Sequence, residues 1–332
     1  MPYSANLYRA VYLQTNGFAL NWPLTKDLRI GDFFTIRDGR IAVLGNIYEP
    51  YFQLDVADIF KIERFRHATP ALSPYEKKGE EPWQTFRPQP SLWHFSQGCY
   101  DNYESNRFGK IHKQNKEAPD YNAYRLYFSQ PGSFFFAAKN VVYSRMPHFS
   151  TIYKEVIRRL TSQLYNFNRI FLVTELATPD YMTTAVSNEF NAELALSVED
   201  YPGENLTEFF SGDHPFKVEL SRGMEMVQLK RKMNTMAFRA KKLELTTEAK
   251  DRIINNLYDS ADPHIDQYAI ELIDNGMFQL FPKIEINPAN ATEFFQWTDM
   301  SLEDIEAISS MALPNYVNRR SIKQGSKGAA SV

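Results

Sequence analysis

The chain has 332 residues and a formal net charge of −3, because 37 Lys and Arg residues are offset by 40 Asp and Glu residues. A dedicated nucleic-acid-binding protein usually carries a clear basic excess, so this balance argues against that class. The single cysteine, Cys99, excludes an internal disulfide and a cysteine-ligated structural zinc site.

Residues 7–48 are predicted to form strands joined by turns. Side chains at positions 7–14 alternate as in a strand, and Asn16-Gly17 is a turn signal. Asp38-Gly39 stands between two short runs of β-forming residues. This pair supplies the positive φ values of a tight turn, so it predicts a β-hairpin.

Residues 66–122 are predicted to form a long irregular insertion. Six prolines and mixed charges interrupt any regular pattern there, and aliphatic residues are few. Four aromatic side chains are expected to pack this insertion onto the rest of the protein: Trp83, Phe86, Trp93 and Phe95.

Regular patterns resume at residue 123 and continue to residue 245. The expected elements are strands at 124–128, 134–138 and 170–174, a helix at 151–166, alternating strands at 181–198 and a last strand pair at 216–245. The helix is predicted from apolar residues at helical spacing that follow a capping residue, Ser150 or Thr151. These elements predict an α+β fold, with a mixed, largely antiparallel, twisted β-sheet and packed helices.

The chain after residue 245 is predicted to be α-rich. Three helix starts are indicated, at Thr246 or Thr247, at Asp262-Pro263, and at Ser301 with Asp304 as a capping box. The predicted organisation is a β-rich body at 1–245, an α-rich segment at 246–312 and a disordered basic tail at 313–332.

The sequence lacks the usual motifs of catalysis. The nucleophile-elbow, Walker A and dinucleotide-binding patterns are missing, and the six histidines include no pair at a metal-ligand spacing. Cys99 has no neighbouring histidine that could activate it. These observations predict a protein that is not an enzyme, with no cofactor and no metal.

Six basic residues lie within thirteen positions that hold no acid: Lys230, Arg231, Lys232, Arg239, Lys241 and Lys242. A turn at Asn234-Thr235 would place most of these charges on two adjacent strands beside apolar side chains. Such a surface fits anionic lipid headgroups, which attract each nearby basic residue by about 1 kcal/mol. Nucleic-acid phosphate is an alternative ligand. A solvated sheet face, balanced by acids elsewhere in the fold, is a further alternative.

Four segments of the chain resemble the gasdermin family, particularly its compact bacterial members. Residues 17–48, with Leu28-Arg29-Ile30-Gly31-Asp32, are similar to the N-terminal strand and leucine-glycine turn of that family. Residues 151–175 look like its helix and central strand, residues 183–198 like the strand pair that follows, and residues 216–245 like its terminal hairpin.

The resemblance implies a protein that is stored with an inhibitory C-terminal segment over a β-rich body. A protease would release the body, which would self-associate into a homo-oligomer and insert amphipathic hairpins into a bilayer as a large β-barrel pore. Residues 181–198 and 216–245 are long enough for this role, because a membrane-crossing strand needs about 9–11 residues with alternating faces.

The functional prediction is therefore an autoinhibited pore-forming effector of antiviral defence or cell death. Its expected partners are anionic membrane lipid, an activating protease and further copies of itself, and no nucleic acid. It is expected to be cytoplasmic at rest, because no apolar run reaches the roughly 18 residues of a spanning helix and the first residues do not form a secretory signal. The resemblance implies that it is membrane-bound after activation.

A non-enzymatic structural or assembly protein, for instance of a phage or injection particle, is the alternative function. Strands rich in aromatic residues, long proline-rich insertions and the lack of catalytic motifs suit such a protein equally well.

Overall fold

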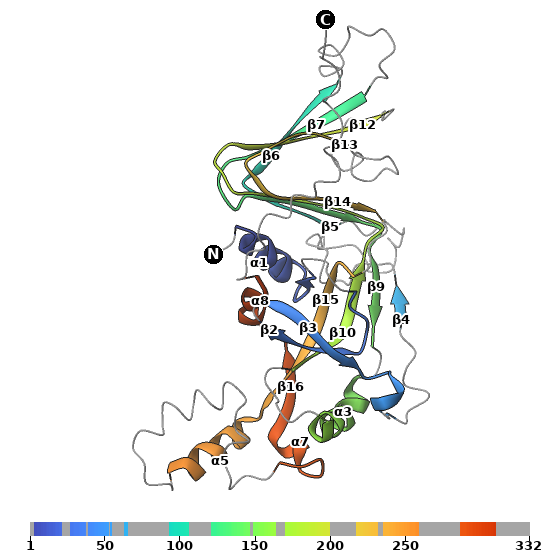
Figure 1. Cartoon of the computed structure of the whole chain (residues 1–332), viewed down its shortest axis with the longest axis vertical. Coiled ribbons are helices and arrows are strands. Elements are labelled where there is room, and N and C mark those ends of the chain that lie inside the picture. Colours follow the sequence, from blue (N-terminus) through green and yellow to red (C-terminus); the bar gives the residue numbers. More distant parts are fainter. Residues whose placement is uncertain are drawn as a thin grey trace, which may run out of the picture.

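The computed structural model describes residues 3–21, 27–37, 39–52, 54, 63–65, 93–105, 121–146, 149–163, 170–199, 217–231, 235–258 and 286–309. The fold is α+β, as predicted, and the strand pairs in these ranges are antiparallel. It has two parts, a body with one large sheet and an arm with two smaller sheets (Figure 1).

Several predictions lie outside the described residues: Trp83, Phe86, Lys232, the helix starting at 262 and the tail at 313–332.

The body is built on an eight-stranded sheet. Its main path is β1 (Ala19–Leu20), β15 (Ala237–Leu245), β10 (Ile170–Thr178), β2 (Asp32–Arg37) and β3 (Arg40–Asn46); β16 (Phe295–Asp299) pairs with β15, β9 (Val142–Arg145) with β10, and β4 (Glu63–Phe65) with β9. Strand β10 is buried along most of its length, which explains its apolar sequence. The predicted hairpin is confirmed, because β2 and β3 pair across a turn in which Gly39 has a φ of 67°.

Helices pack at both ends of the body. The helices are α1 (Ala5–Gln14), α3 (Phe149–Gln163), α5 (Thr247–Tyr258), α7 (Ala291–Phe294) and α8 (Leu302–Ser309), with a 3₁₀ turn η1 (Pro50–Phe52). Figure 1 shows α1 and α8 at the end nearest the arm, and α3, α5 and α7 at the far end. The helix predicted at 151–166 is confirmed as α3, whose residues Ile152, Val156 and Leu160 are buried. Thr246 caps α5 as predicted, since its Oγ1 accepts the Ala249 N–H at 3.1 Å.

The first element differs from the prediction. Residues 5–14 form helix α1 rather than a strand. Leu7, Tyr8 and Val11 are buried, and their spacing places them on one helical face. The turn predicted at Asn16-Gly17 is present, and the positive φ of both residues ends the helix.

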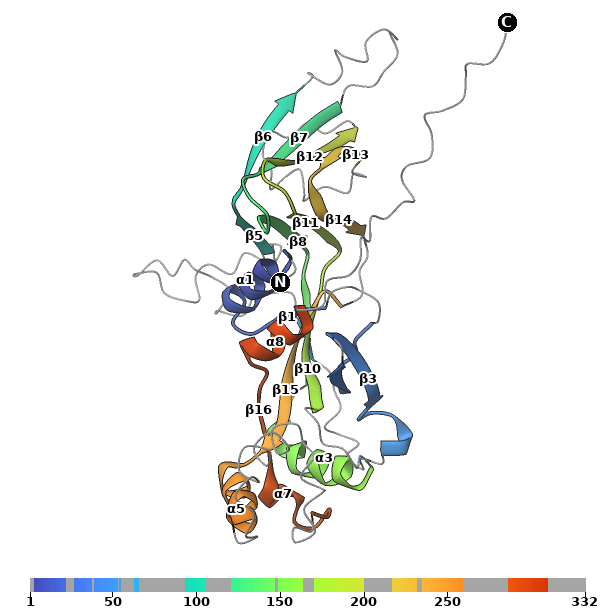
Figure 2. The ribbon, with the colours of Figure 1, turned by 60° about the vertical axis from the view of Figure 1, so that its left-hand side comes forward.

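The arm consists of four long antiparallel strands, each broken by a bend. The lower layer has the order β14 (Met224–Arg231), β11 (Tyr181–Ser187), β8 (Phe134–Lys139) and β5 (Trp93–Gln97), and the upper layer has the order β13 (Lys217–Arg222), β12 (Ala192–Glu199), β7 (Tyr121–Phe128) and β6 (Cys99–Ser105). The chain passes between the layers four times, so each strand of one layer continues into a strand of the other. The upper layer folds back over the lower one in Figure 1, and Figure 2 shows the bend from another direction.

We call this bend the elbow and define it by Gly98, residues 129–133, residues 188–191 and Gly223. Each crossing contains a residue in the left-handed conformation, with φ of 63° at Gly98, 80° at Gly132, 53° at Asn191 and 64° at Gly223. Glycine adopts this conformation without a steric penalty. The backbone therefore sets the bend at all four crossings.

The irregular insertion predicted at 66–122 is wrong for residues 93–105, which form β5 and β6, and for residues 121–122, which begin β7. The prolines of this region all lie outside these strands. Because prolines are common in this region, the short strand patterns on both sides of Gly98 were not recognised in the sequence. Trp93 and Phe95 do pack against the body as predicted, and Trp93 Nε1 donates a hydrogen bond to Tyr143 Oη at 2.7 Å.

Two apolar cores hold the fold together. The main core lies between the body sheet, its helices and the lower layer of the arm. The arm core lies between the two layers and consists of Leu126, Phe128, Phe135, Ala137, Ala185, Ala192, Leu194 and Leu196. Strand β8 contributes Phe134 and Phe136 to the main core and Phe135 to the arm core. Burial of both faces explains its uninterrupted apolar sequence.

Candidate functional site

The five predicted lipid-binding residues that the structure describes are divided between two sheets. Lys230 and Arg231 lie at the end of β14, which pairs with β11 in the arm. Arg239, Lys241 and Lys242 lie on β15, which pairs with β10 and β16 in the body. The predicted strand pair at 216–245 is therefore wrong, because β14 and β15 belong to different sheets.

Arg239 is engaged in contacts inside the protein. Its Nη1 lies 3.0 Å from Glu175 Oε2, and its Nη2 donates to the Thr15 carbonyl at 3.0 Å. The guanidinium also lies 4.4 Å from the centroid of the Phe18 ring. With 22% of its side chain exposed, Arg239 joins β15 to β10 and to the end of α1, and it is not placed on a surface that a lipid could reach.

Lys241 and Lys242 are paired with acids from the end of the described chain. Lys241 Nζ lies 2.7 Å from Asp299 Oδ1 on β16, and Lys242 Nζ lies 3.1 Å from Asp304 Oδ1 on α8. We call residues 286–309 the β16–α8 segment. It contains five acids and no Lys or Arg: Glu293, Asp299, Glu303, Asp304 and Glu306. The segment therefore covers part of the basic cluster with opposite charge.

Asp304 also caps helix α8. Its Oδ2 accepts the Ser301 N–H at 2.9 Å and the Ser301 hydroxyl at 2.8 Å, and its own N–H donates to Ser301 Oγ at 3.3 Å. This is the predicted capping box. The buried Asp304 carboxylate thus both caps the N-terminus of α8 and forms an ion pair with Lys242.

The upper layer of the arm has one apolar and one charged face. Leu126 and Leu194 point into the arm core. Their neighbours lie on the opposite face, where Arg125 Nη1 lies 2.9 Å from Glu193 Oε1 and Arg222 Nη2 lies 3.6 Å from Glu193 Oε2. Glu193 itself is buried between the two arginines, and only the Arg222 side chain is largely exposed. Alternation of this kind is typical of strands with one face in an apolar medium and the other in water.

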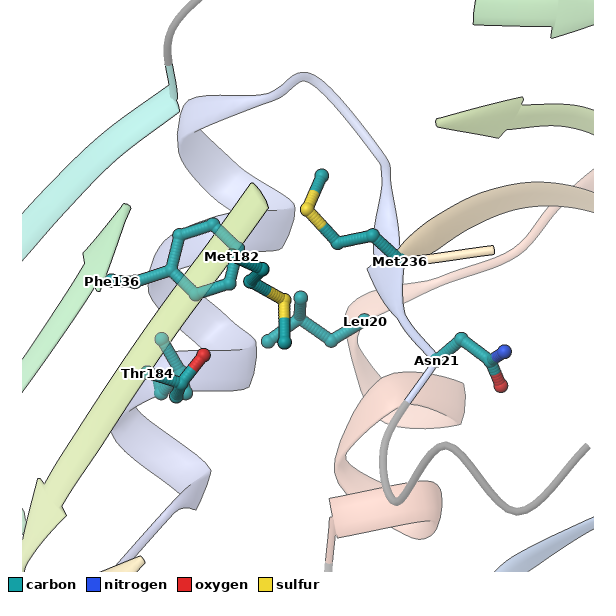
Figure 3. A pocket seen from close by; sticks show the side chains of 7 residues that line it. Leu20, Asn21, Phe136, Met182, Thr184 and Met236 are labelled. Carbon is teal, nitrogen blue, oxygen red and sulfur yellow. The ribbon is translucent and has the colours of Figure 1, made fainter. Parts of the chain in front are cut away.

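A small cavity separates α1 from the lower layer of the arm (Figure 3). Its volume is about 10 Å³, which is the space of about one water molecule. The lining residues are Leu7, Leu20, Asn21, Phe136, Met182, Thr184 and Met236. The cavity has no room for a substrate. Thr184 Oγ1 is buried here and has no hydrogen-bond partner among the described residues.

Replacement of Thr184 by valine is expected to preserve or raise stability. Valine has the same shape, and the variant no longer buries an unpaired hydroxyl, which costs about 1–3 kcal/mol. The matched control is Thr15→Val, because the Thr15 hydroxyl donates to the Val11 carbonyl at 2.6 Å and accepts the Phe18 N–H at 3.2 Å. Urea unfolding should show a loss only for Thr15→Val. An equal loss for Thr184→Val would contradict the prediction and indicate a bridging water.

Glu225 lies near the start of β14, beside the N-terminus of α1. Burial raises its pKa, although the backbone N–H groups of Ser4 and Tyr3 donate to the carboxylate and act in the opposite direction. Its Oε2 is buried without a hydrogen-bond partner in the described part of the chain. Burial, followed by the negative charge of Glu225, also raises the pKa of Tyr8.

Replacement of Glu225 by glutamine is expected to increase stability at pH 7. The raised pKa means that the folded protein binds this proton more tightly than the unfolded chain, so ionisation of the carboxylate costs stability at neutral pH. This cost falls as the pH drops through the pKa of Glu225 in the folded protein. It is gone by about pH 4, near the pKa of glutamate in the unfolded chain. Urea unfolding across this pH range should show an advantage for Glu225→Gln that vanishes in acid. A pH-independent difference would contradict the prediction.

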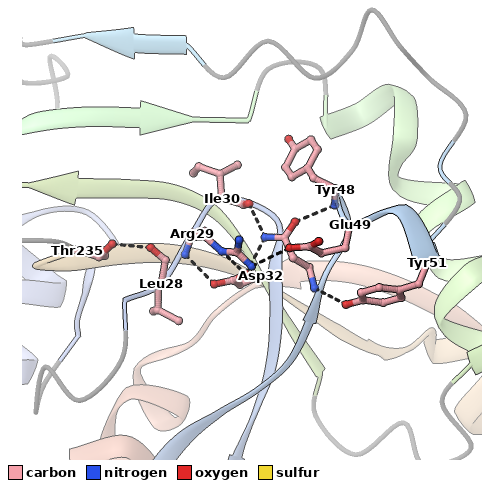
Figure 4. Close-up of polar contacts among 9 residues, drawn as sticks. Leu28, Arg29, Ile30, Asp32, Tyr48, Glu49, Tyr51 and Thr235 are labelled. Carbon is pink, nitrogen blue, oxygen red and sulfur yellow. Dashed lines mark hydrogen bonds and ion pairs between the residues drawn. The ribbon is translucent and has the colours of Figure 1, made fainter.

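A polar network in the body sheet surrounds Asp32 and Asn46, at the open end of the β2–β3 hairpin (Figure 4). Asn46 Nδ2 donates to Asp32 Oδ1 at 2.7 Å and to the Ile30 carbonyl at 2.9 Å. The Arg29 N–H donates to Asp32 Oδ2 at 2.7 Å. Both oxygens of this buried carboxylate are thus used to shape the turn at residues 28–32.

Across the described ranges, His, Cys, Asp and Glu side chains do not gather in any group of three that could hold a metal ion. None of the helices in those ranges combines the length and the apolar character that crossing a bilayer requires. The chain matches no protein-family model, and no curated protein matches it at a significant level.

Proposed function

We propose that this chain is an autoinhibited, gasdermin-like effector of defence or cell death that permeabilises membranes with the two hairpins of its arm, β6–β7 and β12–β13. The alternation in the upper layer carries the proposal, because its apolar face is folded inward onto the arm core and the ion pairs of Glu193 with Arg125 and Arg222 lie on the opposite face. Opening at the elbow would expose the apolar face to lipid and leave the charged face in water.

The β16–α8 segment is the proposed restraint. It adds β16 to the body sheet, packs α8 against α1 and neutralises Lys241 and Lys242. Its release by a protease would uncover two lysines and remove five acids, and both changes favour anionic lipid. The proposed partners are therefore an activating protease, anionic membrane lipid and further copies of the chain, with a move from cytoplasm to membrane on activation.

Dye release from lipid vesicles tests this function. Full-length protein is compared before and after limited proteolysis, on phosphatidylcholine vesicles with and without phosphatidylserine. We expect release only after proteolysis and mainly from the anionic vesicles. A cleaved protein that leaves both kinds of vesicle intact would refute the proposal.

The basic end of β14 is expected to contribute most of the lipid affinity of the activated protein. Changing Lys230, Arg231 and Lys232 to Glu removes three attractions of about 1 kcal/mol each, so vesicle binding should weaken by about two orders of magnitude. The control variant changes Arg9, Lys154 and Arg158 to Glu, which alters the net charge equally at other sites. Cosedimentation at low salt should distinguish the two variants, and equal weakening would show that only net charge matters.

A structural or assembly role is the second candidate, and the strand order of the arm favours it. In the described residues, β5 and β14 end the lower layer and β6 and β13 end the upper layer. Exposed strand edges can pair with another chain. Native mass spectrometry without lipid would support this role if it showed a fixed stoichiometric partner or a regular oligomer.

A further inference from the structure

Helix α1 lies between the arm and the β16–α8 segment in both views (Figures 1 and 2). Its N-terminal end contacts the elbow at one crossing and the start of β14 beside a second crossing. Asn6 Nδ2 lies 3.4 Å from the Gly132 carbonyl oxygen. The N–H groups of Ser4 and Tyr3 donate to Glu225, two residues after the crossing at Gly223.

The remainder of α1 is held by the β16–α8 segment and the lower layer. Tyr12 Oη donates to the Met300 carbonyl at 2.7 Å, immediately before α8, and α1 packs along α8. Leu7 faces Phe136 and Met182 across the small cavity, where Figure 3 shows the helix passing behind β11. One short helix thus contacts both the segment that ends the described chain and the bend of the arm.

We infer that α1 is a latch that makes the elbow sensitive to the β16–α8 segment. While the segment holds α1 in place, the N-terminal end of the helix braces the crossing at Gly132 and the start of β14, and the upper layer stays folded on the arm core. When the segment leaves, or when the contacts at either end of α1 are removed, the upper layer opens. The inference concerns the arm in solution and does not depend on the membrane step of the proposed function.

Cys99 can report this opening. It is the only cysteine. It follows Gly98 at the elbow, pairs with Phe128 in the upper layer and packs, half-buried, against the arm core. Opening of the upper layer would expose the thiol fully to solvent, so an increase in its rate of reaction with a maleimide, relative to the unaltered protein, reports a larger open population.

The test compares the labelling rate of Cys99 in full-length variants, without lipid and without denaturant. Glu225→Ala removes the acceptor at the N-terminal end of α1, and Tyr12→Phe removes the donor at the other end. Each substitution removes a hydrogen bond that stabilises the closed arm, so each should increase the labelling rate by about tenfold. Glu225→Gln keeps an acceptor and should label as slowly as the unaltered protein. Leu13→Ala, on an exposed position of α1, is the matched control and should also label slowly.

Two results would overturn the inference. The first is labelling at the unaltered rate in both Glu225→Ala and Tyr12→Phe. The second is acceleration in Leu13→Ala equal to that in Tyr12→Phe, because loosening of the helix in general would then explain both. Tyr12→Phe removes a single oxygen atom, so it keeps the test decisive if Glu225→Ala fails to fold. Since no vesicle is present, a failed dye-release experiment leaves this result unaffected.

Discussion

A chain that ends at Leu245 is expected to aggregate rather than to fold as a soluble monomer. The β16–α8 segment supplies five large side chains to the main core, each at most 6% exposed, in addition to Ala291: Phe294, Phe295, Met300, Ile305 and Ile308. At about 1.5–3 kcal/mol for each buried side chain, their loss removes roughly 8–15 kcal/mol. This equals the whole stability of a typical domain. Size-exclusion chromatography and circular dichroism should show the loss directly, and the exposed apolar surface should make the product bind membranes or be toxic in cells.

The matched control is a chain that ends at Ser309, which keeps every described contact and should unfold like the full-length protein. Cleavage between residues 259 and 285 gives a second comparison. It leaves the β16–α8 segment present, so the two pieces should stay associated in solution until anionic vesicles or mild denaturant separate them. A soluble, inert monomer ending at Leu245 would contradict both the expected instability and the restraining role, and would favour the structural alternative.

Replacement of Arg239 by methionine is expected to destabilise the protein by about 2–3 kcal/mol. Breaking a fully buried ion pair costs about 3–5 kcal/mol, and the value is lower here because the Arg239 and Glu175 side chains are 22% and 27% exposed. The hydrogen bond to the Thr15 carbonyl and the contact with Phe18 are lost as well. Urea unfolding measures the effect.

Lys241→Met is the control for this measurement. The ion-pair partner of Lys241, Asp299, is 84% exposed. The pair should therefore contribute less than about 1 kcal/mol to the free energy of unfolding. In a Glu175→Gln background the effect of Arg239→Met should also fall, because no carboxylate is then left unpaired. Equal effects of Arg239→Met and Lys241→Met would contradict the structural role of Arg239.

Local sequence patterns predicted the elements that are determined within a few residues. The Asp38-Gly39 hairpin, helix α3 and the caps at Thr246 and Ser301 depend on neighbouring hydrogen bonds and turn geometry. Helix α1 was not predicted, because residues 7–14 satisfy both an alternating pattern and the helical spacing that the buried Leu7, Tyr8 and Val11 follow. The strands at 93–105 were not predicted, because prolines lie close to them on the N-terminal side.

The candidate site could not be derived from the sequence because its contacts are between distant residues. Arg239 is 64 positions from Glu175, and Lys241 is 58 positions from Asp299. A run of basic residues shows only that charge is present, and the partners are decided by which strands lie side by side. Because β14 and β15 lie in different sheets, the described basic residues are divided between the arm and the body.

Strand β8 also has a consequence for how the protein unfolds. Its even-numbered residues, such as Phe136, lie in the main core, and its odd-numbered residues, such as Phe135, lie in the arm core. Regions that share buried surface melt cooperatively, so the lower layer belongs to the same cooperative unit as the body. Among the described residues, the upper layer contributes no buried side chain to the main core. Its detachment is therefore a subglobal transition, which leaves the body intact and requires far less free energy than global unfolding.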